Sequence, residues 1–267
     1  MQPELSLGEA VRQGARLLEE GGIDAPRLTA EVLLAHALGR ERSYLFAHST
    51  DRLPELAWIH FGRWLHERLQ GKPTQYITRR QEFYGRDFEV GPGVLIPRPE
   101  TEHVIEAVLS FPEIVGPIVD VGTGSGCIAI TLALELHRST IACDIASMDI
   151  ARRNAKRLSA DVQFFRGDLL TAVRTASMVV TNPPYIPSGD ALSREVAGWE
   201  PHPALFSGPD GLDAWRRIIE QTPAGSWLVG EIDSRAAMLP LFGSSWEHQE
   251  IRPDLAGRPR VVVARRK

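Results

Sequence analysis

The sequence predicts an α/β protein in which a small all-helical domain precedes a mostly parallel β-sheet with helices on both faces. Three observations carry this prediction. Residues 1–72 consist of helical segments that end at glycine or proline. From about residue 100 onward, short apolar strands alternate with helical segments. Between them, strand-forming residues surround Gly85-Arg86-Asp87, which predicts a β-hairpin in a linker. We therefore expect three parts, at residues 1–72, 73–99 and 100–267.

The first part predicts three helices. Ser6-Leu-Gly-Glu9 has the pattern of a capping box, and the helix that follows it should end at Gly21-Gly22. A second helix should begin near Asp24-Ala-Pro26 and end at Gly39, and a third should extend from about Pro54 to Gln70. Charges of both signs are close to balanced here, which argues against strong nucleic-acid binding by this domain.

The third part predicts a sheet of six strands. The expected strands are residues 118–121, 140–144, 162–165, 177–181, 226–231 and 261–264. The helices expected between them are residues 128–136, 150–158 and 212–221. Ligands of such sheets bind where the strands end and the strand order reverses, so the loops that follow the strands are the places to search for a site.

Composition limits the classes of function. The net charge is −4 and the isoelectric point is about 6.1, so no broad basic surface indicates nucleic acid as a stable partner. Cys127 and Cys143 lack the spacing of a metal site or a disulfide framework, and buried free thiols in a reducing cytosol are expected, with no metal. The sequence contains neither a membrane-spanning apolar run nor the pattern of a signal peptide. We expect a cytoplasmic protein without a membrane partner.

A glycine-rich loop follows the first predicted strand of the sheet. It reads Asp120-Val-Gly122-Thr123-Gly124-Ser125-Gly126, and its glycines allow the backbone to approach a ligand. Asp144, at the end of the next strand, can accept both hydroxyls of a ribose. The GxGxxG fingerprint of dehydrogenases is not met, because Cys127 stands in the sixth place. Asp120 before the first glycine is typical of methyltransferases and would position a methionine amino group. A tight turn without a ligand remains the alternative.

Gly167-Asp168-Leu169 follows the third predicted strand. Asp168 is placed to accept a hydrogen bond from an adenine amino group, and Leu169 to pack on the ring. The alternative for Asp168 is the N-cap of a helix, and both roles can coexist.

The tetrapeptide Asn182-Pro183-Pro184-Tyr185 follows the fourth predicted strand. An amide or exocyclic amine is a poor nucleophile because its lone pair is delocalised. The Asn182 side-chain oxygen and the Pro183 carbonyl can accept from its two N–H bonds and aim the nitrogen at a methyl donor. The prolines make the loop stiff, and Tyr185 offers a ring that stacks on a planar group. A loop with no catalytic role is the alternative.

In combination these motifs resemble the release-factor-specific, protein-(glutamine-N5) methyltransferases of the HemK/PrmC type. The resemblance covers nearly the whole chain, and further segments carry it: residues 22–36, 71–77, 82–85, Leu95-Ile-Pro-Arg-Pro-Glu-Thr-Glu102, Glu200-Pro-His-Pro-Ala-Leu205 and residues 254–263. It implies a Rossmann-like class I sheet that binds S-adenosylmethionine (SAM) and releases S-adenosylhomocysteine, with a helical domain that docks the protein substrate.

The resemblance also implies the substrate, which is the glutamine in the Gly-Gly-Gln loop of class-I peptide-chain release factors. By this resemblance the loop from Gly122 to Gly126, Asp144 and Leu169 line the SAM site, and Asn182 contacts both cofactor and substrate. Residues 182–185 bind the glutamine amide. Phe83 and Arg98 shape the substrate side, although Arg98 can instead pair with Glu100 or Glu102.

The chain departs from the family pattern after the fifth predicted strand. The family has Glu-Ile-Gly with a glutamine three residues later, whereas Asp233 and Ala236 occupy these two positions here. Two other functions remain open. An adenine-amine methyltransferase acting on DNA or RNA would use the same tetrapeptide on a flipped-out base, and a SAM-binding scaffold would have no catalytic role.

Overall fold

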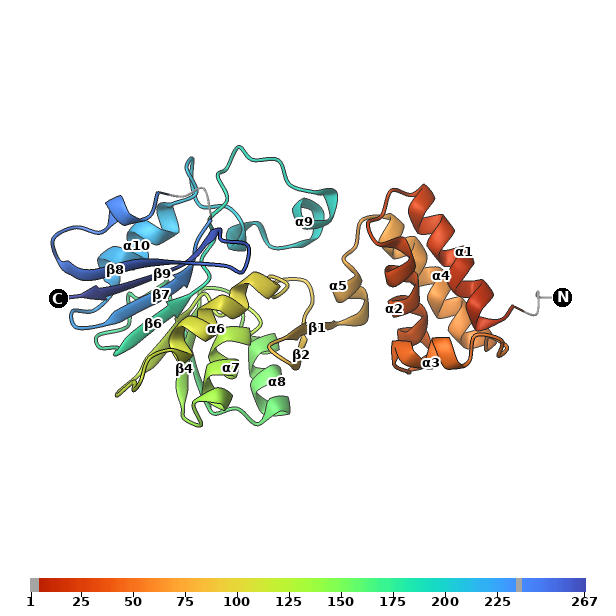
Figure 1. Cartoon of the computed structure of the whole chain (residues 1–267), viewed down its shortest axis with the longest axis horizontal. Coiled ribbons are helices and arrows are strands. Elements are labelled where there is room, and N and C mark those ends of the chain that lie inside the picture. Colours follow the sequence, from red (N-terminus) through yellow and green to blue (C-terminus); the bar gives the residue numbers. More distant parts are fainter. Residues whose placement is uncertain (1–4, 234–236) are drawn as a thin grey trace. The chain divides into compact units, whose positions relative to one another are not determined.

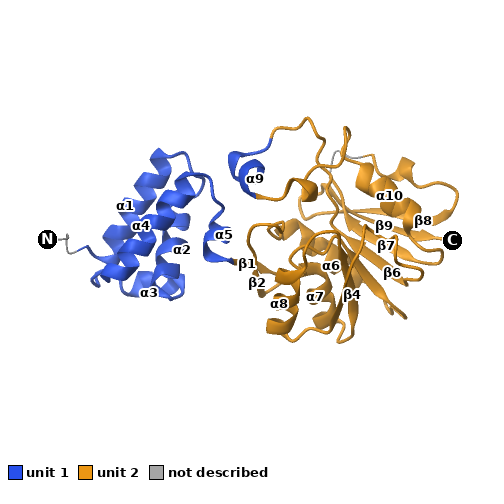
Figure 2. Cartoon of the chain, turned by 180° about the vertical axis from the view of Figure 1, so that it is seen from behind, with its two compact units in different colours: residues 1–79, 192–199 blue, residues 80–191, 200–267 orange. Residues whose placement is uncertain are grey.

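The chain divides into two units, drawn in different colours in Figure 2. The computed structural model describes residues 5–233 and 237–267. Unit 1 comprises the chain up to Arg79 together with Leu192–Trp199, and unit 2 comprises Arg80–Ala191 and Glu200–Lys267. The expected linker, residues 73–99, is therefore shared between the units. The segment at 192–199 joins the N-terminal unit although it lies far along the chain, which no local pattern in the sequence indicates.

Unit 1 is entirely helical. Its helices are α1 (Leu7–Glu20), α2 (Pro26–Leu38), α3 (Arg42–Ala47), α4 (Glu55–Leu69), α5 (Thr74–Thr78) and α9 (Arg194–Trp199). The capping box predicted at the start of α1 is confirmed, because Glu9 N donates to Ser6 Oγ and Ser6 N donates to Glu9 Oε2. α1 ends at Gly21 and α2 begins at Pro26, as expected. The short helices α3 and α5 were not predicted.

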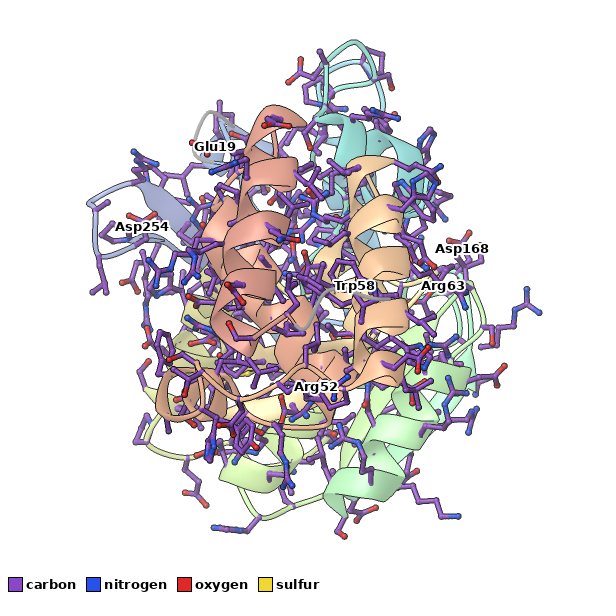
Figure 3. All side chains as sticks on the ribbon, turned by 90° about the vertical axis from the view of Figure 1, so that its right-hand side faces the viewer. Glu19, Arg52, Trp58, Arg63, Asp168 and Asp254 are labelled. Carbon is purple, nitrogen blue, oxygen red and sulfur yellow. The ribbon has the colours of Figure 1, made fainter. Side chains whose placement is uncertain are left out.

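The core of unit 1 lies between α1, α2 and α4. Leu18, Leu33 and Phe61 are fully buried there. Gly14 allows α1 to approach α4 closely, since a Cβ at this position would lie 2.6 Å from Phe61 Cζ. Figure 3 looks onto α1 and α4, with Trp58 and Arg63 labelled on α4.

An ion pair attaches α9 to α4 within unit 1. Arg68 Nη2 lies 2.5 Å from Glu195 Oε2, and the Arg68 residue is only 7% exposed. Lys72 adds a cation–π contact, with Nζ 5.8 Å from the centre of the Trp199 ring. A guanidinium so deeply buried needs a charged partner, so Glu195 holds α9 against the N-terminal helices.

Unit 2 is built on a seven-stranded sheet of order β5-β4-β3-β6-β7-β9-β8 (Figure 1). Its strands are β3 (Ile118–Val121), β4 (Thr140–Asp144), β5 (Val162–Arg166), β6 (Met178–Thr181), β7 (Trp227–Glu231), β8 (Trp246–Pro253) and β9 (Pro259–Arg266). The first five strands in spatial order are parallel to one another. β9 is antiparallel to its two neighbours, β7 and β8. A separate hairpin is formed by β1 (Arg80–Phe83) and β2 (Arg86–Glu89), as predicted.

Helices cover both faces of the sheet, as expected. The longer ones are α6 (Glu102–Leu109), α7 (Cys127–Glu135), α8 (Asp149–Leu158) and α10 (Asp213–Gln221), and short 3₁₀ helices are η1 (Pro99–Thr101), η2 (His202–Ala204) and η3 (Leu239–Leu241). Residues of α6, α7 and α8 pack on one face in a cluster with the hairpin, and α10 packs on the other through Trp215 and Ile218. β3 and β6 are buried along their whole length, which explains their short, fully apolar or nearly apolar sequences.

Edge strand β8 and helix α6 were not predicted. β8 exposes most of its polar residues at the sheet edge, so its sequence lacks the apolar run of an inner strand. Across residues 5–233 and 237–267, every helix is too short or too polar to span a lipid bilayer.

Candidate active site

Four neighbouring strands bring three of the predicted site segments, and one further acid, to one edge of the sheet. In the parallel register Val121 pairs with Cys143 on one side and with Thr181 on the other, and Thr181 pairs with Gly230. The next residues along these strands therefore end at the same level. They are the glycine loop after β3, Asp144 on β4, Asn182 after β6 and Glu231 on β7. The strand order reverses between β3 and β6, where ligands of such sheets bind.

The glycine loop is a tight turn between β3 and α7. Gly122, Gly124 and Gly126 have φ values of 73°, 53° and 84°, a region that side chains disfavour. A Cβ on Gly126 would lie 2.8 Å from Ile130 Cδ1 and 3.1 Å from Ala151 Cβ, so glycine also allows α7 and α8 to approach. Asn154 fixes the loop from α8, because its Nδ2 donates to Ser125 O at 2.9 Å. These contacts hold the turn within the protein itself, through α7 and α8.

Asp144 contacts this loop directly. Its Oδ2 accepts from Gly124 N at 3.0 Å, and its Oδ1 accepts from Ala146 N at 2.9 Å. Each carboxylate oxygen retains a second lone pair, so both can still accept a ribose hydroxyl. Ile145 beside it is 59% exposed, an uncovered apolar side chain that our reading of the sequence missed. The sequence signal for Ile145 was its position, because it is an apolar residue directly after Asp144 at the end of β4.

Asp120 is a buried acid with one unpartnered oxygen. Its Oδ2 accepts from Thr123 Oγ1 at 2.6 Å and from Ala129 N at 3.2 Å. Within the part of the chain that the structure describes, Oδ1 has no hydrogen-bond partner. Burial raises the Asp120 pKa to about 7, although both hydrogen bonds act to lower it. A cationic ligand group would stabilise the ionised form, which is the property expected of a residue that positions an amino group.

Asp168 and Leu169 lie after β5. Turns follow Asp168 rather than a helix, so the alternative role as a helix N-cap is wrong. Instead Asp168 Oδ2 pairs with Arg217 Nη2 on α10 at 2.6 Å. Leu169 has a positive φ of 52° and packs, partly buried, against the cluster beneath α10. The Asp168 carboxylate thus already has a charged partner, and its second oxygen is the one more open to a ligand.

The Asn182–Tyr185 tetrapeptide is fixed by hydrogen bonds that the sequence did not predict. Asn182 Nδ2 donates to Thr101 Oγ1 at 3.0 Å, and Tyr185 OH donates to Glu231 Oε1 at 3.1 Å. Pro183 is buried. Burial, together with the neighbouring Glu231 carboxylate, raises the Tyr185 pKa far above its usual range, so the hydroxyl keeps its proton.

Thr101 and Glu231 are site residues that sequence reasoning missed. They are 2% and 1% exposed, and Thr101 Oγ1 donates to Glu231 Oε2 at 2.6 Å. The only signal was positional, because Glu231 is the last residue of a predicted strand and its neighbour strand carries the tetrapeptide. Two departures from the family pattern follow Glu231, at Asp233 and Ala236, and Ala236 lies outside the described residues.

Arg98 and Phe83, which the resemblance assigns to the substrate side, both have partners within the protein. Arg98 forms an ion pair with Glu200, which also accepts from Ile96 N at 3.0 Å, so neither Glu100 nor Glu102 is its partner. The Phe83 ring is fully buried and packs edge-on against Phe88, with ring centres 6.0 Å apart. Phe83 therefore has no free face for a substrate, and its role is to hold the hairpin on the core.

The cysteines are both buried and free, as predicted. Burial raises the pKa of each thiol to about 12, which removes them from nucleophilic chemistry. Within residues 5–233 and 237–267, His, Cys, Asp and Glu side chains form no group of three or more that could hold a metal ion.

Comparisons with solved structures agree with the fold. A T. thermophilus 16S rRNA methyltransferase in complex with AdoMet and guanosine has a TM-score of 0.50 and 15% identity, covering 70% of this chain and 50% of that one. A methyltransferase from Pyrococcus furiosus has a TM-score of 0.50 and 14% identity, covering 76% of this chain and 96% of that one. At these identities the likeness concerns the sheet and its helices alone.

Comparisons of sequence find relatives with much higher identity. The PrmC N-terminal domain matches residues 9–78, and the methyltransferase small domain matches residues 103–197. The release factor glutamine methyltransferase of Koribacter versatilis is 43% identical over 98% of this chain and 99% of its own length. Those of Bacillus anthracis and Bacillus subtilis are 40% and 37% identical, each over 96% of this chain, and over 98% and 96% of their own lengths. With the tetrapeptide and the glycine loop on adjacent strand ends, these likenesses show that the chain belongs to the release factor glutamine methyltransferase family.

Proposed function

We propose that this protein transfers a methyl group from SAM to the side-chain amide nitrogen of the glutamine in the Gly-Gly-Gln loop of class-I release factors. One observation carries the proposal most strongly. Asn182 directs its Nδ2 to Thr101, and within the described residues nothing donates to its Oδ1, which remains an acceptor at the end of the strand next to the glycine loop. An amide N–H₂ group needs such an acceptor, and the near full-length relatives are named for glutamine methylation.

The mechanism is one of orientation and electrostatics. Asn182 Oδ1 and the Pro183 carbonyl accept from the two N–H bonds of the glutamine amide. This localises the lone pair on nitrogen and aims it along the line of attack. Tyr185, whose ring is fixed through its hydroxyl by Glu231, packs on the plane of the amide. No strong base is required, because the amide becomes very acidic once it is methylated and loses its proton to water.

The residues present fit SAM as the donor, which supplies a methyl group made electrophilic by a sulfonium. The unpartnered Asp120 Oδ1 suits the methionine ammonium, and the carboxylate of Asp144 suits the ribose hydroxyls. Ile145 and Leu169 offer apolar side chains for the adenine, and Asp168 its second oxygen for the adenine amino group. Product S-adenosylhomocysteine keeps all of these groups, so the same residues would hold it.

Unit 1 is proposed to dock the release factor. Its surface carries large apolar side chains: Leu17, Leu28, Phe46, Leu56 and Ile59, between 44% and 67% exposed. One glutamine loop offers too little area for selective recognition, and such side chains are what a protein partner covers. Replacing Leu56 and Ile59 on α4 with serine should raise KM for intact factor and leave KM for a Gly-Gly-Gln peptide unchanged. Equal effects on both substrates would contradict the docking role.

The proposed function is tested with isotope-labelled SAM. The protein is mixed with a class-I release factor, with the same factor carrying alanine for the glutamine, and in separate tubes with plasmid DNA and tRNA. Label on the unchanged factor alone supports the proposal. Label on nucleic acid would instead indicate an adenine-amine methyltransferase. Because release factors act in translation, this proposal also assigns the protein to the cytoplasm.

A further inference from the structure

A buried chain of hydrogen bonds connects the substrate-binding tetrapeptide to a carboxylate on the neighbouring strand. It extends from Asn182 Nδ2 to Thr101 Oγ1, at 3.0 Å, and from Thr101 Oγ1 to Glu231 Oε2, at 2.6 Å. The other oxygen of Glu231 accepts from Tyr185 OH at 3.1 Å. One carboxylate therefore contacts the tetrapeptide at both ends, once through Thr101 and once directly.

The Glu231 carboxylate fixes which group donates at each step of this hydrogen-bond chain. An ionised carboxylate can only accept, so the single proton of the Thr101 hydroxyl must point to Glu231. The Thr101 oxygen is then available only as an acceptor, and the amide side that it accepts from is the Asn182 nitrogen. The two sides of a carboxamide have nearly the same shape, so only this polarity distinguishes its two orientations.

We propose that Thr101 and Glu231 are positioning residues that hold the Asn182 carboxamide with its oxygen facing the substrate. This inference rests on the proposed function and deepens it. In the opposite orientation Asn182 would present N–H₂ to the N–H₂ of the substrate amide, and neither group could accept. The acceptor that localises the nitrogen lone pair would be lost although every residue of the tetrapeptide was still present.

The surroundings of Glu231 make its ionisation the sensitive step. Burial raises the Glu231 pKa, and Glu100 raises it further, whereas Thr101, Tyr185 and Arg260 lower it. Asp233 also acts on this cluster, because its charge raises the Tyr185 pKa. When Glu231 takes up a proton it can donate to Thr101, and the polarity of the chain is no longer fixed. Turnover should therefore fall as the pH decreases through the raised pKa.

Isosteric variants separate this role from packing. Thr101→Val removes the hydroxyl and keeps the shape, so kcat should fall roughly 10- to 100-fold with KM and SAM affinity little changed. Thr101→Ser restores the hydroxyl and should restore kcat. Glu231→Gln cannot ionise, so the acidic decline of its pH profile should disappear. The matched control is Thr131→Val on α7, a fully buried threonine whose hydroxyl has no partner in the described part of the chain.

The experiment measures kcat, KM and their pH profiles on release factor, with thermal melts of each variant to verify folding. Thr101→Val should also lose the acidic decline, because without the hydroxyl the protonation of Glu231 can no longer reverse the donor order toward Asn182. A wild-type kcat and pH profile in Thr101→Val would overturn the proposal. So would equal losses in Thr101→Val and Thr131→Val, since these would indicate packing alone.

A second readout keeps this test separate from that of the proposed function. If the wild-type protein methylates no release factor, the proposed function fails. The orientation is then judged by hydrogen exchange of the Asn182 side-chain amide, followed by NMR and assigned with Asn182→Asp. Exchange should be slowed in the wild type and in Thr101→Ser and should become faster in Thr101→Val. The same exchange rate in all three proteins would overturn the positioning role.

Discussion

Replacing Asp120 with asparagine should make the free protein more stable and its hold on SAM weaker. The Asp120 carboxyl is 1% exposed, and burial raises its pKa from 3.8 to about 7. A difference of about 3 pKa units corresponds to roughly 4 kcal/mol against the folded state once the carboxyl is ionised. Asparagine has the same shape and can still accept from Thr123 and Ala129 through its oxygen. Its amide nitrogen takes the place of the unpartnered Oδ1, so the variant removes the charge and keeps the packing.

The pH dependence gives the prediction its sign. Below 3.8 the carboxyl is protonated in both states and has no effect on folding. As the pH rises from there to about 7, the unfolded state ionises while the folded state does not, and stability is progressively lost. Urea unfolding should therefore show Asp120→Asn more stable by ~4 kcal/mol near pH 8 and by ~2 kcal/mol near pH 5.5. Exposed Asp161→Asn is the control and should show neither difference.

SAM binding should show the opposite trend. The ammonium of SAM is expected to pair with ionised Asp120, so binding must release the proton that Asp120 holds below about pH 7. Calorimetric titration of the wild-type protein should give an affinity that weakens about tenfold for each pH unit below that value. Asp120→Asn should bind weakly at every pH. A wild-type affinity that stays constant across this range, or a variant no more stable than the wild type near pH 8, would contradict an ionisable, buried Asp120 at the SAM site.

Three further predictions concern the glycine loop, the attachment of α9 and the thiols. Gly126→Ala should weaken SAM binding by at least about tenfold in titration calorimetry, because the new Cβ would clash with Ile130 and Ala151 at a positive φ and force the loop to move. Gly62→Ala is the control and should leave binding unchanged, because the space around Gly62 is open. Glu195→Ala leaves buried Arg68 without its partner and should lower the unfolding free energy by roughly 2–3 kcal/mol in urea, against less than ~1 kcal/mol for Arg63→Ala in an exposed pair. Cys127 and Cys143 should not react with a thiol reagent near pH 8 until the protein is denatured, and rapid labelling of the folded chain would contradict their burial.

Local signals in the sequence predicted local structure well. The Ser6–Glu9 capping box, the end of α1 at Gly21 and the hairpin around Gly85 each depend on a few adjacent residues. The inner strands were predicted for the same reason, because strands buried on both faces must be short apolar runs. Helix α6 and strand β8 were missed, since the first follows a proline-rich stretch and the second is a polar edge strand.

The candidate site was predicted only where a motif is contiguous. The glycine loop and the tetrapeptide are such motifs, and topology places them side by side on β3 and β6. Thr101 and Glu231 are 130 positions apart, and they meet because α6, which begins directly after Thr101, packs against β7. The ion pair that the sequence suggested for Arg98, with Glu100 or Glu102, was wrong for a similar reason, because the actual partner, Glu200, is 102 positions away. Contacts over such distances follow from the fold and leave no periodic signal.

Mass spectrometry of a class-I release factor, after incubation with SAM and either the wild-type protein or Asn182→Ala, distinguishes glutamine methylation from every alternative. With the wild-type protein we expect one added methyl group on the glutamine of the Gly-Gly-Gln peptide. With Asn182→Ala we expect almost none, although that variant still binds SAM. Methylation at any other residue, or undiminished methylation of this glutamine by Asn182→Ala, would contradict the proposed function.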